Sequence, residues 1–597
     1  RGISLTDTLG KFYEKLIYSR IKRELKRIDY ITPIQAGGRC NIGSSHQLLR
    51  VTSQLQSLIE ENEWEDGTGE MKPRNAVVLA LLDCSRAFDS MNRILLIGTV
   101  QKIGIQGRLL NNITGFLHNR TQSVRINDYY SASKNTKCGG PQGSVITFML
   151  WLIYVNSVVN KIMVNANVNN PSDCAGLFVD DVATWISNPN PQIAIQNMNS
   201  RLTEIYNWSI SNGILFNPNK FGLLYFKNSK KSKQIKNTIE NNKVYFGKEM
   251  IKWSKDQVVK YLGIEIDNGL TFINQLETIL DKMNKRKFMI SNHANFKSGV
   301  NPKILMLHLD AYIRSIILYG SQTWIFKLRG DFKNEFHWST VINKPYRSIW
   351  KKINTLYLRL MKKALGVQIS TSGNATLVRA GELTLDYHIA YHSLVLFLKI
   401  RNGEESLLKK QYCKEKEDDE KWSVSPFFRP AEHMILRLGR VVRIDILNLN
   451  YGEAKIWLRK AMYYEMSEMW YTDDKSLFTK RIYKMWNSTK ISGVMLSKFS
   501  TSLYHQLAVG RCPLRGRKYD LGLEASGTCR FGCLDKETPE HILLKCKFLK
   551  KQQKEIREGC KNNGIYYTLN SILTVDKLKI LVEKLLMKVF MTGKVWN

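Results

Sequence analysis

The sequence predicts a chain of several domains, with an α/β core, a long helical region after it and a small cysteine- and histidine-containing module near the C-terminus. Three observations support this prediction. A continuous apolar run at residues 77–83 ends in a carboxylate, as expected of a strand that is buried on both faces. Residues 275 to about 400 have a mostly helical and basic pattern. Three cysteines and a histidine gather within residues 529–546.

Length and charge bound the class of protein. A chain of 597 residues is too long for one ordinary domain, and its length favours about four units. Hydrophobic residues make up 43% and can fill real cores, which excludes wholesale disorder. Lys and Arg number 89 against 52 Asp and Glu, which gives a formal net charge of +37. This excess predicts a polyanionic partner, nucleic acid first and an anionic membrane surface second.

Three further features concern the surroundings of the chain. No run of 18 apolar residues is apparent, so we expect no membrane span. Ten cysteines, most of them scattered, exclude a disulfide scaffold and favour a reducing compartment. The first residues, Arg1-Gly2-Ile3-Ser4, are neither a signal peptide nor a plausible translation start, so we expect a fragment of a longer polypeptide.

The remaining elements are predicted in chain order. Apolar residues at helical spacing predict a helix at 9–27, and an apolar stretch around two acids at 175–185 predicts a strand–turn–strand hairpin. Residues 430–510 have the pattern of amphipathic helices. Residues 57–75 predict a surface loop, and residues 228–243 predict a basic, polar hairpin or loop. The charged residues 414–426 predict a linker.

Asp83, Asp180 and Asp181 are the candidate catalytic residues, because each lies inside or at the end of an apolar segment. If they converge they can hold divalent metal, and Mg²⁺ usually takes one or two carboxylates together with substrate phosphates. Two such ions can activate an attacking hydroxyl and stabilise a leaving pyrophosphate. The alternative is that Asp83 caps a helix beginning near Ser85 and that Asp180-Asp181 is an ordinary turn.

The surroundings of these acids resemble the catalytic motifs of reverse transcriptases of non-LTR (LINE-type, jockey-like) retrotransposons. LLDCSRAFDSMNR (81–93) resembles the first motif, and GGPQGSVITFMLWLIYVNSV (139–158) resembles the second. FVDD (178–181) resembles the Phe-x-Asp-Asp hairpin of these enzymes. WSISNGILFNPNKFGLLYF (208–226) and KYLGIEID (260–267) are similar to the next two motifs, in the same order.

The resemblance extends on both sides of these motifs. Upstream, QAGGR (35–39) resembles part of the fingers of the same enzymes. Downstream, LYGSQTW (318–324) and LVRAGELTL (377–385) resemble the segment that follows the polymerase core in jockey-type elements. The chain differs from the family pattern at Gly2, at Gly38 and mildly at Val179, and both glycines are predicted to loosen a loop that must close on the nucleotide.

The resemblance implies an α/β right-hand polymerase, with fingers, a palm that holds a small antiparallel sheet and a helical thumb, followed by an α-helical C-terminal region with a zinc knuckle. The implied segments are N-terminally truncated fingers (1–75), the palm with the catalytic motifs (76–270), the helical thumb and connection (271–400), a helical C-terminal extension (401–515), and the zinc knuckle with C-terminal helices (516–597).

The resemblance also assigns roles to single residues. Asp83, Asp180 and Asp181 would bind the two catalytic Mg²⁺ ions, and Lys220 would protonate or neutralise the departing pyrophosphate. Four residues would bind the incoming nucleotide or the nascent pair: Arg1, Phe88, Gln142 and Gly143.

Among these residues, Phe88 has the most specific implied role. Its ring would leave room for hydrogen but not for hydroxyl at the sugar 2′ position, and the alternative is that Phe88 is a core residue. Arg1 would recognise the triphosphate, because a guanidinium binds phosphate with two hydrogen bonds. Ser144 is predicted to cap the helix that follows Gly143.

Cys529, Cys533, His541 and Cys546 have the spacing C-x3-C-x7-H-x4-C, which suits one structural Zn²⁺ ion in tetrahedral coordination. The alternative is three buried thiols and a surface histidine. Such knuckles commonly bind RNA. The basic residues just upstream are predicted to contact RNA phosphates, and the alternative is that they form a solvated loop. These residues are Arg511, Arg515, Arg517 and Lys518.

The implied function is that of an RNA-directed DNA polymerase, which extends a DNA 3′-hydroxyl primer along element RNA by two-metal nucleotidyl transfer during target-primed integration. The implied partners are the element RNA template, the DNA primer and target, deoxynucleoside triphosphates and an endonuclease region in the missing N-terminal part, and no membrane. The implied location is the nucleus, with a cytoplasmic ribonucleoprotein stage. The alternative is a catalytically inactive RNA-binding relative; an RNA-dependent RNA polymerase is disfavoured by Phe88.

Overall fold

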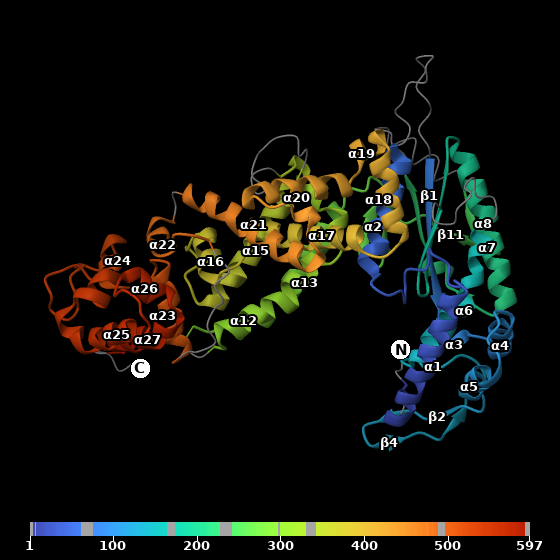
Figure 1. Ribbon diagram of the computed structural model, residues 1–597, viewed down its shortest axis with the longest axis horizontal. Helices are drawn as coiled ribbons and strands as arrows, with labels where there is room; N and C mark the ends of the chain where they lie inside the picture. The colour runs from blue at the N-terminus through green and yellow to red at the C-terminus, as the bar shows by residue number, and fades with distance from the viewer. Residues whose placement is uncertain are drawn as a thin grey trace, which may run out of the picture. The chain divides into compact units, whose positions relative to one another are not determined.

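The computed structural model describes residues 4–5, 7–60, 76–163, 174–226, 242–296, 299–329, 342–473, 476–486 and 496–591. Its chain forms two compact units (Figure 1). Unit 1 comprises Arg1–Gln275 and Glu404–Phe427, and unit 2 comprises Leu276–Gly403 and Phe428–Asn597. The five segments predicted from the sequence remain predictions.

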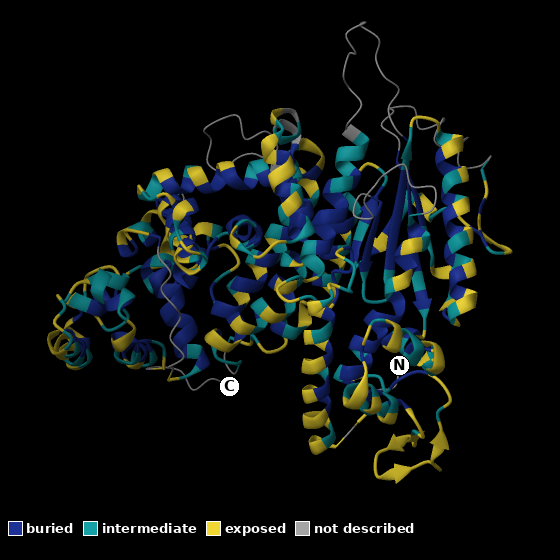
Figure 2. Ribbon diagram, turned by 45° about the vertical axis from the view of Figure 1, so that its right-hand side comes forward, coloured by how far each residue is buried: buried dark blue, intermediate teal, exposed yellow. Residues whose placement is uncertain are grey.

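Unit 1 is built on a five-stranded antiparallel sheet in which β1 (Ala76–Ser85) is central. On one side of β1 lie β7 (Asp181–Asn188) and then β6 (Ala175–Phe178). On the other side β1 pairs with β9 (Gly222–Phe226) and, near its end, with β8 (Leu215–Phe216). The predicted strand at 77–83 is confirmed, and its residues 76–82 are all buried (Figure 2).

Helices and smaller strand pairs surround this sheet. The helices of unit 1 are α1 (Thr8–Arg27), α2 (Ser44–Glu60), α3 (Ala87–Ser90), α4 (Arg93–Lys102), α5 (Gly107–Leu117), α6 (Val145–Val155), α7 (Val159–Ile162), α8 (Pro191–Asn212), α18 (Leu407–Glu417) and α19 (Asp419–Val424). Its other strands are β2 (Thr121–Gln122), β3 (Arg125–Ile126), β4 (Tyr129–Tyr130), β5 (Lys134–Asn135), β10 (Val244–Phe246), β11 (Glu249–Ile251), β12 (Val258–Tyr261) and β13 (Ile264–Asp267).

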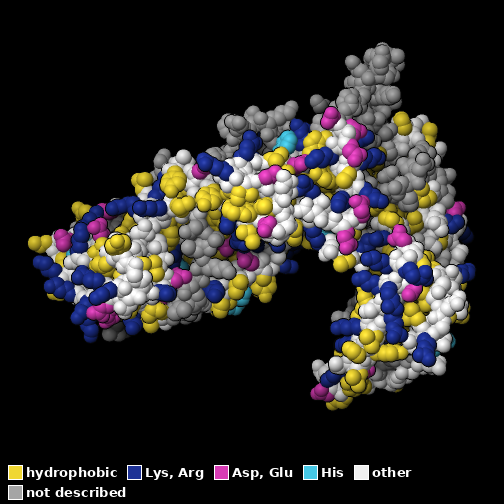
Figure 3. Space-filling view, viewed as in Figure 1, with side chains coloured by type: hydrophobic (Ala, Val, Ile, Leu, Met, Phe, Trp, Pro, Cys, Tyr) yellow, Lys and Arg dark blue, Asp and Glu magenta, His cyan; other side chains and the backbone are white. Residues whose placement is uncertain are grey.

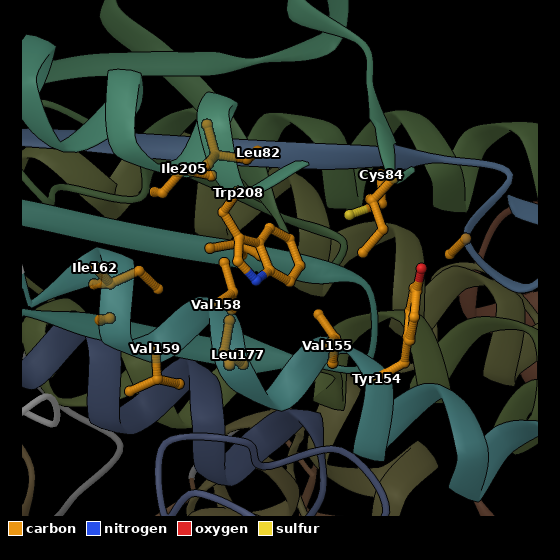
Figure 4. Packing of buried hydrophobic residues seen from close by; sticks show 14 of the residues in the cluster. Leu82, Cys84, Tyr154, Val155, Val158, Val159, Ile162, Leu177, Ile205 and Trp208 are labelled. Carbon is orange, nitrogen blue, oxygen red and sulfur yellow. The ribbon is translucent and has the colours of Figure 1, made fainter. Parts of the chain in front are cut away.

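The main core of unit 1 lies between the sheet and the helices α6, α7 and α8. Leu82 of β1 and Leu177 of β6 belong to the same buried cluster as Val158, Ile205 and Trp208 (Figure 4). Burial of a large apolar side chain stabilises a fold by about 1.5–3 kcal/mol, so this cluster fixes the sheet against its helices. The ends of β1, β6 and β7 are therefore held in place by packing.

One helical stretch of this core is apolar enough to resemble a membrane span. Val145–Ile162, which runs through α6 and α7, has 18 residues with a mean hydropathy of 1.6, although 67% of it is buried inside the protein. Polar residues such as Asn156 interrupt this stretch, so the sequence contains no unbroken run of 18 apolar residues here. Its composition is explained by its place in the core, where helices are hydrophobic all round.

The predicted linker at 414–426 is wrong, because most of it forms helix and belongs to unit 1. α18 packs against α2, and the carboxylate of Glu415 is buried, where it accepts a hydrogen bond of 2.7 Å from the Ser425 hydroxyl. The charges of this stretch indicated a solvated linker, because the buried apolar residues lie on either side of it. Leu408 and Phe427 are two of them. Of the surface loop predicted at 57–75, residues 57–60 instead end α2, and residues 61–75 lie outside the described residues. Most of the stretch predicted as a basic hairpin or loop at 228–243 also lies outside them, since only residues 242 and 243 are described.

Unit 2 is helical in the part of it that the structure describes, as the sequence predicts. Its N-terminal part contains α11 (Phe288–Ser291), α12 (Pro302–Leu309), α13 (Ser315–Leu318), α14 (Ile325–Arg329), α15 (Arg347–Leu365), α16 (Gly373–Ala380) and α17 (Leu385–Asn402), and α10 (Ile273–Arg286) leads into it from unit 1. Its C-terminal part contains α20 (Phe428–Val442), α21 (Tyr451–Tyr471), α22 (Leu477–Ile482), α23 (Lys498–Ala508), α24 (Arg515–Asp520), α25 (Lys550–Asn562), α26 (Leu569–Thr574) and α27 (Lys579–Met591).

Candidate active site and candidate metal centre

The backbone brings the three candidate aspartates to one end of the sheet. Asp83 near the end of β1 lies directly opposite Asp181, the first residue of β7. Opposed residues of antiparallel strands have Cα atoms about 4.5–5.5 Å apart. Asp180 precedes Asp181 in the turn between β6 and β7, so the hairpin predicted from the sequence is formed. The structure thus places together acids that are far apart in the chain.

The negative charges of all three acids affect the pKa of a neighbouring thiol. Cys84 is buried, and its pKa is raised well above the ordinary value, first by burial and then by the negative charges of Asp180, Asp83 and Asp181. A thiol in such surroundings stays protonated and is a poor nucleophile. The candidate reactive groups at this end of the sheet are therefore the carboxylates, together with any cation that they bind.

Lys220 lies beside these carboxylates, as its implied role requires. It ends a short 3₁₀ turn, Pro218–Lys220, and its Nζ is 3.4 Å from Oδ2 of Asp83. The lysine side chain is 61% exposed, so the pair itself adds little stability. Apart from this ion pair, the buried Oδ2 atom of Asp83 has no hydrogen-bond partner among the described residues. An oxygen in that situation is open to a metal ion or to a substrate group.

Phe88 stands at the edge between core and solvent. It lies in α3, which follows β1, and its ring centroid is 5.8 Å from that of Trp151 with an interplanar angle of 58°. The ring packs against the main core but is only partly buried. The sequence left a core role and a nucleotide-binding role of Phe88 as alternatives. In the structure the ring contacts the core on one side and is partly exposed, five residues after Asp83.

The Pro-Gln-Gly-Ser turn has the local structure that its sequence predicts. Gly143 has φ of 105°, a backbone conformation that side chains with a Cβ rarely adopt. Ser144 caps α6, with its hydroxyl 3.4 Å from the Thr147 N–H, and donates a hydrogen bond of 2.6 Å to the buried carboxylate of Glu14. The Gln142 carbonyl accepts a hydrogen bond of 2.9 Å from Ser4 N–H. Arg1 lies outside the described residues.

Residues 35–39 are tied down, which corrects the prediction that Gly38 loosens this loop. Arg39 donates hydrogen bonds to the carbonyls of Gln35, Ile31 and Thr32, at 2.9, 2.6 and 3.0 Å. Gly38 has φ of 78°, and a Cβ there would lie 2.7 Å from the Phe148 ring, so glycine is required by close approach. Gly2 lies outside the described residues.

Sequence reasoning missed one residue of this loop. Gln35 lies 144 positions before Val179 in the chain, yet its side-chain amide is hydrogen-bonded to the Val179 backbone next to Asp180. No local pattern signals a contact of this kind, because a glutamine inside a glycine-containing stretch is typical of an exposed turn.

The predicted cysteine–histidine cluster is assembled in unit 2. Ligand atoms of Cys529, Cys533, His541 and Cys546 all lie within 4.8 Å of one another, and among the described residues no other group of three or more such side chains is as close. The Cys546 sulfur is 3.9 Å from that of Cys529 and 3.8 Å from that of Cys533. The buried thiols and surface histidine of the alternative interpretation do not fit, since His541 is buried.

The chemistry of the cluster fits a cation. Both ring nitrogens of His541 are buried without a hydrogen-bond partner among the described residues, although Oδ2 of Asp535 lies 3.4 Å from Nδ1. Burial, and then the neighbouring thiols, raise the pKa of Cys546 to about 12. Three thiols at such a distance cannot all ionise beside one another unless a metal ion compensates their charge.

A buried ion pair holds the loop between the second cysteine and the histidine. Glu537 is fully buried and accepts hydrogen bonds from the Arg530 guanidinium at 2.7 and 2.8 Å and from Arg515 N–H at 2.8 Å. Among the four basic residues predicted to contact phosphate, Arg515 and Lys518 lie 3.4 and 3.0 Å from the Glu524 carboxylate. These two cations are thus partly neutralised by the protein.

An antiparallel sheet that carries carboxylates at one end is the arrangement expected of the palm of a right-hand polymerase. Residues 1–266 match the family model described as reverse transcriptase (RNA-dependent DNA polymerase). This part of the chain is therefore a reverse transcriptase domain, and the resemblance to the enzymes of non-LTR elements is confirmed by the relatives that follow.

Three curated relatives come from Drosophila melanogaster. The chain is 25% identical over 328 residues to the RNA-directed DNA polymerase from mobile element jockey, which covers 54% of this chain and 33% of the relative. Probable RNA-directed DNA polymerases from transposon BS and transposon X-element are 25% and 26% identical, again over 54% of this chain and 33% of the relative. The chain thus spans about a third of the length of these relatives.

Among solved structures, telomerase from Candida albicans in complex with a fragment of telomeric RNA is matched over 63% of this chain and 54% of that one. The sequence identity is 11% and the TM-score is 0.28, which is too low to support a statement about the fold.

Proposed function

We propose that the chain extends a DNA 3′-hydroxyl along an RNA template with deoxynucleoside triphosphates. The observation that carries this proposal is the register of β1 and β7, which sets Asp83 opposite Asp181 with Asp180 in the adjacent turn. Carboxylates in such an arrangement suit Mg²⁺, and the open Oδ2 atom of Asp83 provides a ligand. When bound, two Mg²⁺ ions activate the primer hydroxyl and stabilise the leaving pyrophosphate.

The residues of the chain then position the reactants. The Pro141-Gln142-Gly143 turn would pack against the template and the nascent pair, and Phe88 would border the sugar of the incoming nucleotide. Exposed cations of α1, among them Lys11, Lys15 and Lys22, would contact nucleic-acid phosphates. Figure 3 shows lysine and arginine side chains gathered around this helix.

A primer-extension assay tests the proposal. We expect incorporation of dTTP on poly(rA)/oligo(dT) in the presence of Mg²⁺ and none when the metal is chelated. Binding of RNA without any extension would instead identify a catalytically inactive RNA-binding relative. We also propose target-primed integration in the nucleus, for which an endonuclease would have to nick the target DNA. The assay supplies a preformed primer, so the test does not depend on that endonuclease.

Replacement of Lys220 by alanine should slow nucleotide addition by about a hundredfold or more, the size expected of a positioned proton donor or cation. Lys220 is ion-paired with Asp83, which supports a role beside the reacting groups, so the loss should fall on kcat and leave the KM for template–primer unchanged. Single-turnover extension measures the effect. Lys161→Ala is the matched control, since Lys161 pairs with Glu204 at 3.1 Å in the same unit, and an equal loss in both variants would contradict the assignment.

We further propose that Cys529, Cys533, His541 and Cys546 bind one structural Zn²⁺ ion, which makes this region a zinc knuckle. Purified protein should then contain one zinc ion per chain, measured by elemental analysis. Cys546→Ser should lose nearly all of it and melt at a lower temperature, because the metal stabilises the fold that binds it.

Cys560→Ser is the control for this experiment, since Cys560 is a buried thiol of α25 outside the cluster. It should keep its zinc. Full zinc content in the Cys546→Ser protein, or no zinc in the unaltered protein, would contradict a zinc centre at these residues.

A further inference from the structure

The turn that carries Asp180 contains a strained residue. Val179 has φ of 61°, in the left-handed region, between the last residue of β6 and Asp180. For a β-branched side chain this backbone conformation is a genuine outlier, and it persists only where surrounding contacts hold it. The contacts that hold Val179 therefore decide where the two adjacent carboxylates point.

Those contacts come from two side chains of unit 1. The Oε1 atom of Gln35 accepts a hydrogen bond from Val179 N–H at 2.9 Å, and its Nε2 donates to the Val179 carbonyl at 3.3 Å. Trp151 Nε1 donates to the same carbonyl at 3.0 Å. Gln35 Oε1 also accepts from Gly37 N–H at 2.9 Å, which fixes the orientation of the amide. Both polar groups of the strained residue are thus bonded to side chains.

The backbone around Gln35 is shaped for this contact. Residue 35 forms a parallel bridge with Leu177, Ala36 N–H donates to the Leu177 carbonyl at 2.9 Å, and Leu177 N–H donates to the Ile34 carbonyl at 2.9 Å. A Cβ at Gly37 would lie 2.7 Å from the Val179 nitrogen, so glycine allows the two segments to approach. Gln35 itself is 1% exposed, so its amide has no access to water as an alternative partner.

We propose that Gln35 is a positioning residue for nucleotide addition, which locks the Val179 peptide so that Asp180 and Asp181 face Asp83. The proposal rests on the proposed polymerase function. Without the amide, Val179 can relax to an ordinary backbone conformation, and the peptide that leads into Asp180 rotates. A misplacement of reacting groups by about 1 Å can cost about a hundredfold in rate.

The first test compares Gln35→Met with Asn156→Leu. Asn156 is a matched control, because its amide also bridges backbone groups. It accepts from Thr32 N–H at 2.9 Å and donates to the Tyr30 carbonyl at 2.8 Å, and neither bond is to the turn at Val179. Both variants should lose some stability. Only Gln35→Met should lower kcat, by about tenfold to a hundredfold, with an unchanged KM for template–primer.

Metal binding gives a readout that needs no turnover. Mn²⁺ serves as the probe, and its free-ion EPR signal reports how much remains unbound. Gln35→Met should bind Mn²⁺ about tenfold or more weakly than the unaltered protein and Asn156→Leu. Equal Mn²⁺ affinity and equal kcat in both variants would overturn the role of Gln35, provided that the unaltered protein extends the primer. If the unaltered protein does not extend it, the polymerase proposal fails instead.

Gln35→Glu supplies a pH signature that a purely structural role would not produce, and it serves if Gln35→Met fails to fold. A buried glutamic acid beside Asp180 and Asp181 should have a raised pKa. Below that pKa the protonated carboxyl can donate to the Val179 carbonyl as the amide does, and above it the carboxylate repels that carbonyl. The rate relative to the unaltered protein should therefore rise as the pH falls, and a ratio that stays constant with pH would contradict the proposal.

Discussion

Replacement of Asp180 by alanine is expected to reduce primer extension by about a thousandfold or more. A catalytic metal supplies several kcal/mol of transition-state stabilisation, and about 4 kcal/mol corresponds to about a thousandfold in rate. Asp180 lies in the turn beside Asp181, which faces Asp83 across the sheet, so its loss would remove a proposed metal ligand without removing a core side chain. Extension of oligo(dT) on poly(rA) measures the effect.

Asp89→Ala is the matched control for this variant. Asp89 is an exposed carboxylate of α3 in the same motif as Asp83, and the variant should keep at least about half of the rate. Both variants should bind RNA as the unaltered protein does, since neither removes a cation. An Asp180→Ala protein that extends the primer at a near-normal rate would remove the basis for the catalytic role of these carboxylates.

Replacement of Phe88 by valine is expected to admit ribonucleotides. The ring is only partly buried and rests on Trp151 at 5.8 Å, so a smaller side chain should open space at its exposed edge. A steric wall of one ring is expected to discriminate by about tenfold to a hundredfold. The ratio of kcat/KM for dTTP and UTP on poly(rA) should fall by that factor in Phe88→Val.

Phe116→Val tests whether the effect is specific. Phe116 is a partly buried aromatic residue of α5 that packs against the same core. It should lose stability without a change in sugar selection. If Phe88→Val were less stable but equally selective, Phe88 would be a core residue only, and equal use of both sugars by the unaltered protein would revive an RNA-synthesising polymerase.

Much of unit 1 could be predicted because its pattern is local. The apolar run before Asp83 predicts β1, the helical spacing at 9–27 predicts α1, and the two acids inside an apolar stretch predict the β6–β7 hairpin. Each of these signals arises from residues within a short window, where burial on one or both faces sets the period of the sequence. The meeting of Asp83 with Asp181 follows from the pairing of β1 with β7, which the resemblance to reverse transcriptases implies.

Other features depend on contacts that no short window contains. Gln35 bonds a residue 144 positions away, and Gly38 was expected to loosen a loop although it makes room for Phe148. The charged stretch at 414–426 forms helix because α18 packs against α2, more than 300 residues earlier. In each case tertiary packing overrides what composition alone indicates.

The central claim is that Asp83, Asp180 and Asp181 jointly hold metal, and the most direct measurement is anomalous diffraction from crystals soaked in Mn²⁺ with template–primer and nucleotide. We predict anomalous peaks at about 2.0–2.6 Å from carboxylate oxygens of Asp83 and Asp180, the range of oxygen ligands to divalent ions. Ordered nucleotide at this end of the sheet without any peak between these side chains would contradict the account.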